Sequence, residues 1–163
     1  STVEPWDEKN RREHDYVTHY IVEILQRMGL QVDVAPEENL QFGSIEHLCE
    51  RITARGNVDF FTLLEKLTPT PAICGYPKEE AMREIEHLER HSRYCYGGYI
   101  AVKQGGRRKA YLILRCALVT PGKDHKFCYT VYSGGGITGD SVAAREWDEA
   151  SDKAELLIDC IKK

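Results

Sequence analysis

The chain has 163 residues and a formal net charge of −4 at pH 7, with a pI near 5.9. This length suits one domain, or part of one, and is enough to bury a real hydrophobic core. The acidic balance and the absence of a basic run exclude a general attraction to nucleic acid. No apolar run is long enough to span a membrane, and the first residues lack the pattern of a signal peptide, so we expect a cytoplasmic protein.

The cysteines are spread singly, without the CxxC spacing of zinc or thioredoxin-type sites. Most lie in apolar runs, where cysteine behaves as a small hydrophobic residue. We therefore expect six reduced thiols in the core: Cys49, Cys74, Cys95, Cys116, Cys128 and Cys160.

Helical periodicity predicts a long amphipathic helix from Asp7 to Gly29, with Asp7 as its cap. A short strand, 31–35, and a turn, 36–39, follow. The segment 40–56 favours a strand by its partial alternation, although 46–51 alone could be helical. Asp59 is expected to cap a short helix, 60–66.

Residues 67–78 contain three prolines and a glycine, which predicts an irregular connector. Its apolar centre indicates that it is packed, and packed irregular backbone tends to line sites. A charged helix, 78–90, comes next. Three strands, 94–103, 109–119 and 126–132, are separated by hairpin-length turns and predict an antiparallel meander. A closing helix, 146–161, is expected to turn Ala150, Leu156, Leu157 and Cys160 inward. The predicted fold class is α+β, an antiparallel β-sheet packed with helices.

The chemistry centres on the three glycines that follow the last strand, Gly134, Gly135 and Gly136. Glycines let a backbone pass close to a ligand, and bare N–H groups in such a turn can bind an anion. Glu146, Glu149 and Lys153 follow at helical spacing and share one helix face. This pattern indicates a hard cation together with an anionic substrate.

Four more residues are candidates, each with a simpler alternative. Arg115 lies in an apolar run, where a guanidinium needs a carboxylate, either of a ligand or of an internal salt bridge. Tyr96 precedes two glycines and belongs either to a ligand site or to the core. Taken alone, Glu13 is best interpreted as a solvated residue of the helix surface. A histidine such as His47 is more often structural than catalytic. Glu13, Glu146 and Glu149 together could hold Mg²⁺, which takes a few carboxylates and keeps its waters.

The order of these segments resembles the C-terminal part of the chorismate-utilising enzymes, over essentially the whole chain. The family includes isochorismate, anthranilate, aminodeoxychorismate and salicylate synthases. The seven matching blocks, in order, are 13–14, 45–48, 67–78, 93–98, 113–115, 133–137 and 146–149 with Lys153.

The resemblance implies a role for each candidate residue. Glu13, Glu146 and Glu149 match the glutamates around Mg²⁺, which holds the ring carboxylate of chorismate. Gly134 to Gly136 match a GAG motif whose amides meet that carboxylate, with Gly135 in place of alanine. Tyr96 and Arg115 match the residues that bind the enolpyruvyl carboxylate. His47 matches a histidine near the leaving hydroxyl, and Lys153 a lysine at the substrate and metal end.

Within the family, 69–75 and Glu146-Trp147 are similar to the isochorismate synthases, which feed menaquinone or siderophore synthesis. Water is then the nucleophile rather than ammonia. Salicylate synthases share much of this pattern and go on to eliminate pyruvate.

The resemblance also has gaps. The general-base lysine and the general-acid glutamate of the family match no segment here, so the chain is expected to be a C-terminal piece that is inactive alone. Ala101 stands where the family usually has glycine. Two other hypotheses remain: a non-catalytic ligand-binding or assembly module that self-associates through exposed apolar surface, and a subunit completed by a separate polypeptide.

Overall fold

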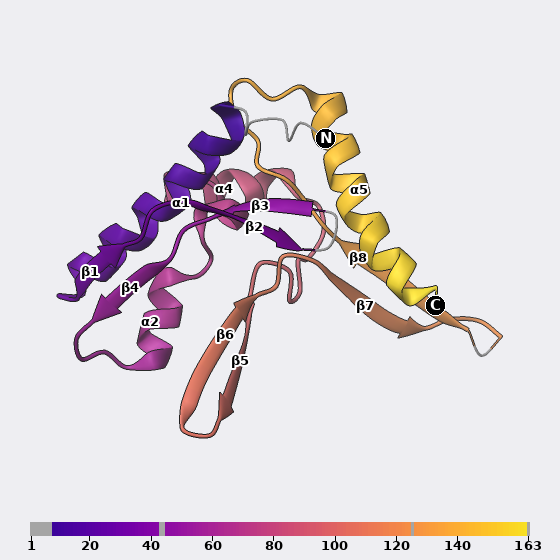
Figure 1. The fold of residues 1–163 in the computed structure, drawn as a ribbon. Coiled ribbons are helices and arrows are strands. Elements are labelled where there is room, and N and C mark those ends of the chain that lie inside the picture. The colour runs from indigo at the N-terminus through magenta and orange to yellow at the C-terminus, as the bar shows by residue number, and fades with distance from the viewer. Residues whose placement is uncertain (1–7, 43–44, 125, 163) are drawn as a thin grey trace. The chain divides into compact units, whose positions relative to one another are not determined.

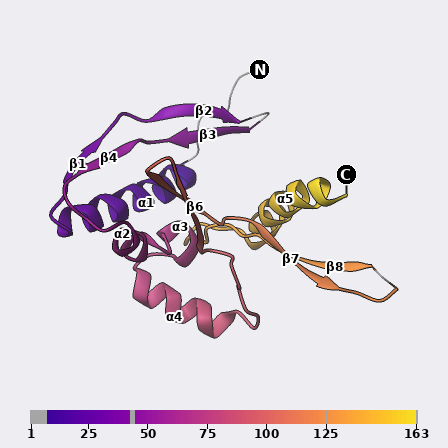
Figure 2. The ribbon, with the colours of Figure 1, turned by 90° about the horizontal axis from the view of Figure 1, so that it is seen from below.

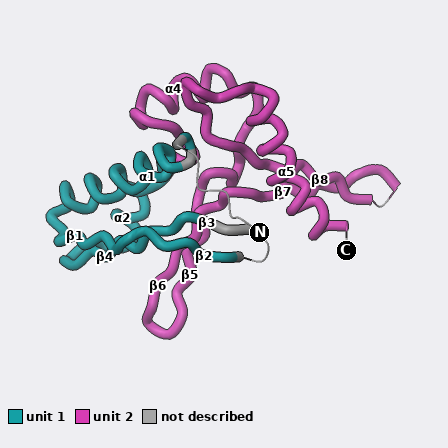
Figure 3. Tube along the Cα trace, turned by 45° about the horizontal axis from the view of Figure 1, so that its top comes forward, with its two compact units in different colours: residues 1–71 teal, residues 72–163 magenta. Residues whose placement is uncertain are grey.

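The computed structural model describes residues 8–42, 45–124 and 126–162. The chain forms two compact units, residues 1–71 and 72–163 (Figure 3). The expected α+β class is confirmed, since helices alternate with small antiparallel sheets in the chain (Figure 1). No helix of the described residues is long and apolar enough to cross a membrane.

The first unit combines two helices with two antiparallel strand pairs. Helix α1 (Glu8–Arg27) precedes β1 (Gln31–Val34), β2 (Glu38–Phe42), β3 (Ile45–Cys49) and β4 (Ile52–Arg55), and α2 (Phe60–Leu67) follows. Strand β1 pairs with β4, and β2 with β3. Figure 2 shows both pairs on the same side of α1. The prediction of extended structure over 40–56 is confirmed and its helical alternative is wrong, but the segment contains the end of β2, all of β3 and all of β4 rather than one strand. The predicted turn 36–39 is too long, because β2 begins at Glu38.

The core of this unit is small and built mainly by α1 and α2. Tyr20, Leu25, Leu30 and Leu64 are its buried apolar residues. The Tyr20 hydroxyl donates to the carbonyl of Lys66 at 2.9 Å, which ties the two helices together. Asp59 caps α2 as expected, because its Oδ2 accepts the amides of Phe61 and Thr62, each at 3.0 Å. The expected cap of α1, Asp7, lies outside the described residues.

The second unit carries two β-hairpins and the closing helix. Helix α3 (Pro71–Cys74) lies at the boundary between the units. The elements that follow are, in order, α4 (Lys78–Leu88), β5 (Tyr99–Gln104), β6 (Arg107–Leu112), β7 (Cys116–Pro121), β8 (Phe127–Tyr132) and α5 (Ala143–Ile161). Strand β5 pairs with β6, and β7 with β8. Helix α5 lies beside β8 (Figures 1 and 2). The strand that precedes the glycines is thus held against the helix that carries the glutamates.

Four sequence predictions differ from the structure here. Residues 109–119 are not one strand: β6 ends at Leu112, and the chain bends at Leu114 and Arg115 before β7. Residues 94–97 form a turn, so that β5 starts only at Tyr99. The predicted meander is therefore two separate hairpins. The connector 67–78 is also less irregular than expected, because it contains the short helix α3.

The burial of side chains also departs from the predictions. All six cysteines are free, yet only Cys74 is buried, while Cys95, Cys128 and Cys160 are exposed. The closing helix α5 has no buried residue, and Leu156, expected to face inward, is 45 % exposed. Apolar runs predicted burial because they are usually covered, but the hairpins and α5 leave many apolar side chains open to solvent.

Candidate functional site

The three glycines begin where β8 ends, and the residues before them fix their position. Tyr132, the last residue of β8, is 9 % exposed. The Ser133 hydroxyl donates to the carbonyl of Ala150 on α5 at 2.6 Å. The start of the glycine segment is therefore attached to the middle of α5.

Tyr96 packs against the first glycine from one side. A Cβ atom at Gly134 would lie 2.6 Å from the Tyr96 hydroxyl oxygen, so only glycine leaves room for this contact. The Tyr96 ring stacks on Tyr132, with ring centroids 6.4 Å apart and an interplanar angle of 23°. Burial raises the pKa of Tyr96, and the charge of Arg93 opposes part of that rise. The phenol therefore stays protonated at neutral pH and can donate a hydrogen bond.

The carboxylates of α5 approach the second glycine. A Cβ atom at Gly135 would lie 3.4 Å from Glu149 Oε1 and 3.7 Å from Glu146 Oε2. Lys153 forms an ion pair with Glu149, and its Nζ lies 3.4 Å from the carbonyl oxygen of Gly134. The spacing of these three residues did place them on one helix face, as the sequence indicated.

This arrangement can bind charged ligands of both signs. Oxygens of two carboxylates lie near one backbone position, which fits a hard cation that also keeps water ligands. The Tyr96 hydroxyl lies beside the same glycine segment and can donate to an anion. Gly136, the third glycine, is partly buried. The second unit thus brings together Tyr96, the glycines, Glu146, Glu149 and Lys153.

Arg115 does not lie in the environment that the sequence predicted. It occupies the exposed bend between β6 and β7 rather than a buried strand. Among the described residues it has neither a hydrogen bond nor an ion pair, so the internal salt bridge that we considered is absent from them. The argument from the cost of burying a guanidinium is therefore wrong for this residue, and its implied role rests on the resemblance alone.

Glu13 and His47 belong to the first unit. Glu13 lies on α1 and forms an ion pair with Lys9 at 3.5 Å. His47 lies in β3 opposite Leu40, while its side chain is outside the described residues. The glutamates of α5 belong to the second unit.

Sequence reasoning missed a polar cluster next to Glu13. Atoms of His14, Glu37 and Glu50 lie within 4.8 Å of one another, a spacing that would suit a metal ion. Arg11 Nη1, however, is 3.4 Å from Glu37 Oε2, and the Thr18 hydroxyl donates to Glu50. We interpret the cluster as a network of ion pairs and hydrogen bonds that joins α1 to residues 37 and 50, because Arg11, Thr18 and His14 already contact its two carboxylates. No local pattern in the sequence indicates it, since its members are far apart in the chain.

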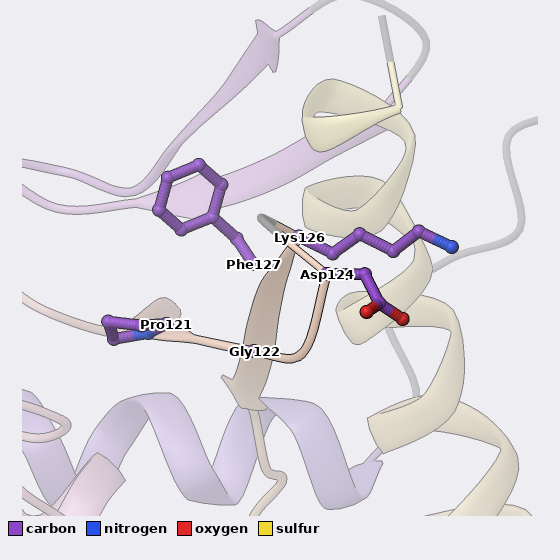
Figure 4. Close-up of a pocket in the computed structure, with 5 residues that line it drawn as sticks. All are labelled: Pro121, Gly122, Asp124, Lys126 and Phe127. Carbon is purple, nitrogen blue, oxygen red and sulfur yellow. The ribbon is translucent and has the colours of Figure 1, made fainter.

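A surface hollow elsewhere in the second unit has no link to these residues. It lies at the β7–β8 turn and is lined by Pro121, Gly122, Asp124, Lys126 and Phe127 (Figure 4). Figure 4 shows Asp124 and Lys126 pointing to one side of the turn and Phe127 pointing away from them. None of the candidate residues lines it, so it is an open turn rather than the site.

Comparison with known proteins identifies the family of the chain. A family model for the chorismate binding enzymes matches residues 6–159. The chain belongs to this family. It is 31 % identical over 157 residues to the chloroplastic isochorismate synthase of Catharanthus roseus, a match that covers 94 % of this chain and 26 % of the relative. It is 30 % identical over 155 residues to isochorismate synthase MenF of Escherichia coli, covering 93 % and 34 %.

Anthranilate synthase component 1 of Pseudomonas aeruginosa also matches, with 29 % identity over 121 residues, 72 % of this chain and 24 % of the relative. The chain thus spans a quarter to a third of the length of these three relatives.

Proposed function

We propose that the protein to which this chain belongs is an isochorismate synthase. The reaction is an isomerisation of chorismate. A new C–O bond forms from water at one ring carbon as that water gives up a proton. The ring double bonds shift, and the C–O bond of the existing hydroxyl breaks as that hydroxyl takes up a proton and leaves as water. Two features support this assignment: the relatives named isochorismate synthase match over most of the chain, and the residues around Gly134 suit a dicarboxylate.

The observation that carries the proposal is the meeting of opposite charges at the glycine segment. The amides of Gly134 to Gly136 would donate to the ring carboxylate, next to the ammonium of Lys153. Tyr96 would donate its hydroxyl hydrogen to the enolpyruvyl carboxylate, with Arg115 as its partner at that end. Binding by several groups at once orients the ring and so lowers the entropic cost of reaction.

A bound Mg²⁺ would supply positive charge beside the ring carboxylate. Glu146 and Glu149 would hold it, since their carboxylates are the hard oxygen ligands that the ion prefers. The resemblance implies Glu13 as a further ligand. His47 would lie near the departing hydroxyl, as the resemblance implies. The chain's own residues therefore bind and orient the substrate.

The test is product analysis. The protein that contains this chain is incubated with chorismate and Mg²⁺, and the products are separated by chromatography. Isochorismate is expected, and replacement of Glu149 by Gln should abolish its formation, whereas replacement of Asp148, its exposed neighbour on α5, by Asn should not. Salicylate, or anthranilate in the presence of ammonium, would assign the protein to another branch of the family.

We further propose that a polypeptide of these 163 residues makes no isochorismate by itself. No segment of the chain matches the proton-transfer lysine or glutamate of the family, and such groups contribute about 10²–10⁴-fold to rate. Isochorismate formation well above background by this polypeptide would refute this second proposal. It would leave the assignment of the reaction intact.

One observation favours a different function, a non-catalytic module that self-associates. Both hairpins of the second unit expose apolar side chains, among them Ile100, Val102, Tyr111, Phe127 and Tyr129. Where such exposed apolar side chains form a contiguous patch, the patch commonly mediates association. Sedimentation velocity distinguishes the two functions: concentration-dependent dimers without turnover would favour the module, and a monomer would argue against it.

A further inference from the structure

Arg93 lies three residues before Tyr96 and contacts several segments of the second unit. Its Nε and Nη2 donate to the two carboxylate oxygens of Glu89, at 2.7 and 2.6 Å. Its Nη1 donates to the carbonyl oxygen of Ile73, 20 residues earlier, at 2.9 Å. Its guanidinium carbon lies over the Tyr96 ring, 5.6 Å from the centroid. One side chain thus joins α4, α3 and the Tyr96 turn.

The bonds of Arg93 differ from an ordinary surface ion pair. An exposed pair four residues apart on a helix contributes only about 0.3–0.5 kcal/mol. Here the carboxylate is bound bidentately, and both partners are partly buried, with side chains 25 % and 30 % exposed. Hydrogen bonding to Arg93 lowers the pKa of Glu89, and the same bonds raise the pKa of Arg93. The bond to Ile73 adds a contact that a solvated pair would lack.

The backbone around Tyr96 depends on the same group of residues. The Tyr96 amide donates to the carbonyl of Arg93 at 2.8 Å, which closes the turn. Gly97 has a φ of +80°, and a Cβ atom there would overlap Cγ2 of Ile73. Ile73 therefore packs directly on the turn while its carbonyl accepts from Arg93. The position of the turn, and with it the position of the Tyr96 hydroxyl on Gly134, is set by these contacts.

We propose that Arg93 is a positioning residue of the site: by joining Glu89, Ile73 and the Tyr96 ring, it holds the Tyr96 hydroxyl against Gly134, where a substrate carboxylate would bind. This inference rests on the proposed function, since it assigns Arg93 to the same site. We assign Arg93 itself no catalytic role, because each of its three guanidinium nitrogens already donates a hydrogen bond to Glu89 or Ile73. Its effect on the ligand passes through Tyr96.

The test compares Arg93→Lys and Glu89→Gln with a matched control, Arg90→Lys. Arg90 is exposed and lies one residue after Glu89. Lysine keeps the charge at position 93 but cannot bind a carboxylate bidentately. In the protein that contains this chain, both test variants should raise KM for chorismate by roughly tenfold, with kcat within about twofold, because a misplaced Tyr96 weakens ground-state and transition-state binding alike. The control should leave both constants unchanged, and equal KM values in all four proteins would overturn the inference.

A second readout needs no turnover. With tyrosine labelled at the ring Cζ, the NMR signal lost in Tyr96→Phe identifies Tyr96. That signal should shift in Arg93→Lys and Glu89→Gln and stay in place in Arg90→Lys. An unchanged Tyr96 signal in the test variants would refute the positioning role. Absence of isochorismate from the unsubstituted protein would instead refute the proposed function, and the Tyr96 signal would still decide whether Arg93 positions that ring.

Discussion

Replacement of Gly134 by alanine tests the contact on which the site depends. The added methyl carbon would lie 2.6 Å from the Tyr96 hydroxyl oxygen, well inside van der Waals contact. Tyr96 cannot simply swing away, because its ring stacks on Tyr132 and lies under Arg93. The nearest ring atom of Tyr96, Cζ, would be 3.7 Å from the methyl carbon, an ordinary separation. The hydroxyl alone therefore causes the conflict.

The size of the effect follows from this geometry. Overpacking of one methyl group costs typically about 1–3 kcal/mol. The same substitution lowers the entropy of the unfolded chain, which returns about 0.4–1 kcal/mol. Gly134→Ala should thus destabilise the chain by roughly 1–2 kcal/mol. When Tyr96→Phe is also present the methyl meets no oxygen, so the substitution should be neutral or slightly stabilising.

Urea unfolding of the four proteins of this double-mutant cycle measures the coupling directly. Gly139→Ala is the matched control, because a Cβ atom there would meet nothing within 4 Å. Equal costs of Gly134→Ala with and without Tyr96→Phe would show that the hydroxyl does not pack on Gly134. That result would refute the contact between Tyr96 and the glycine segment on which the site is built.

Three further predictions follow from local features. Arg93 holds the pKa of Glu89 below its ordinary value of 4.5, so Glu89 should stabilise the folded chain above that pH and lose this contribution as the pH falls through the lowered pKa. Glu89→Gln should therefore flatten the acid limb of a stability–pH profile measured by urea unfolding. An unchanged acid limb would contradict this prediction. Gly97→Ala should lower the free energy of unfolding by roughly 1–3 kcal/mol, because position 97 has a φ of +80° and an added Cβ atom would overlap Ile73. Gly29→Ala is the comparison: its φ is +76° but no atom lies near the added Cβ, so its loss of stability should come from backbone strain alone. Asp59→Ala should lower the free energy of unfolding by about 1 kcal/mol, because it removes the cap of α2. Asp59→Asn should keep most of the stabilisation by the cap. Equal losses of stability in both variants would exclude capping as the cause.

The helices were the most predictable part of the fold. Periodicity located α1, α2, α4 and α5 to within a few residues, and the capping preference of aspartate identified Asp59. These features depend on neighbours within one or two turns, which the sequence displays directly. The grouping of Glu146, Glu149 and Lys153 was predictable for the same reason.

The hairpins were less predictable because their limits depend on distant partners. The apolar run 109–119 contains neither glycine nor proline, so nothing in it indicates the bend at Arg115. The bend follows from pairing: Ile113 exchanges hydrogen bonds with Gly97 and Gly98, and the chain then leaves the β5–β6 ladder. The contact of Tyr96 with Gly134 joins residues far apart in the chain, and only the glycine itself hinted at a close approach. Arg93 had an i, i+4 partner in the sequence, but its bond to Ile73 had no local signal.

Labelling of the product by solvent oxygen tests the central claim most directly. The protein that contains this chain is incubated with chorismate, Mg²⁺ and ammonium in water enriched in heavy oxygen, and the products are analysed by mass spectrometry. We predict isochorismate whose new ring hydroxyl carries the heavy isotope, because water is the proposed nucleophile. Anthranilate, or isochorismate without the label, would contradict the account.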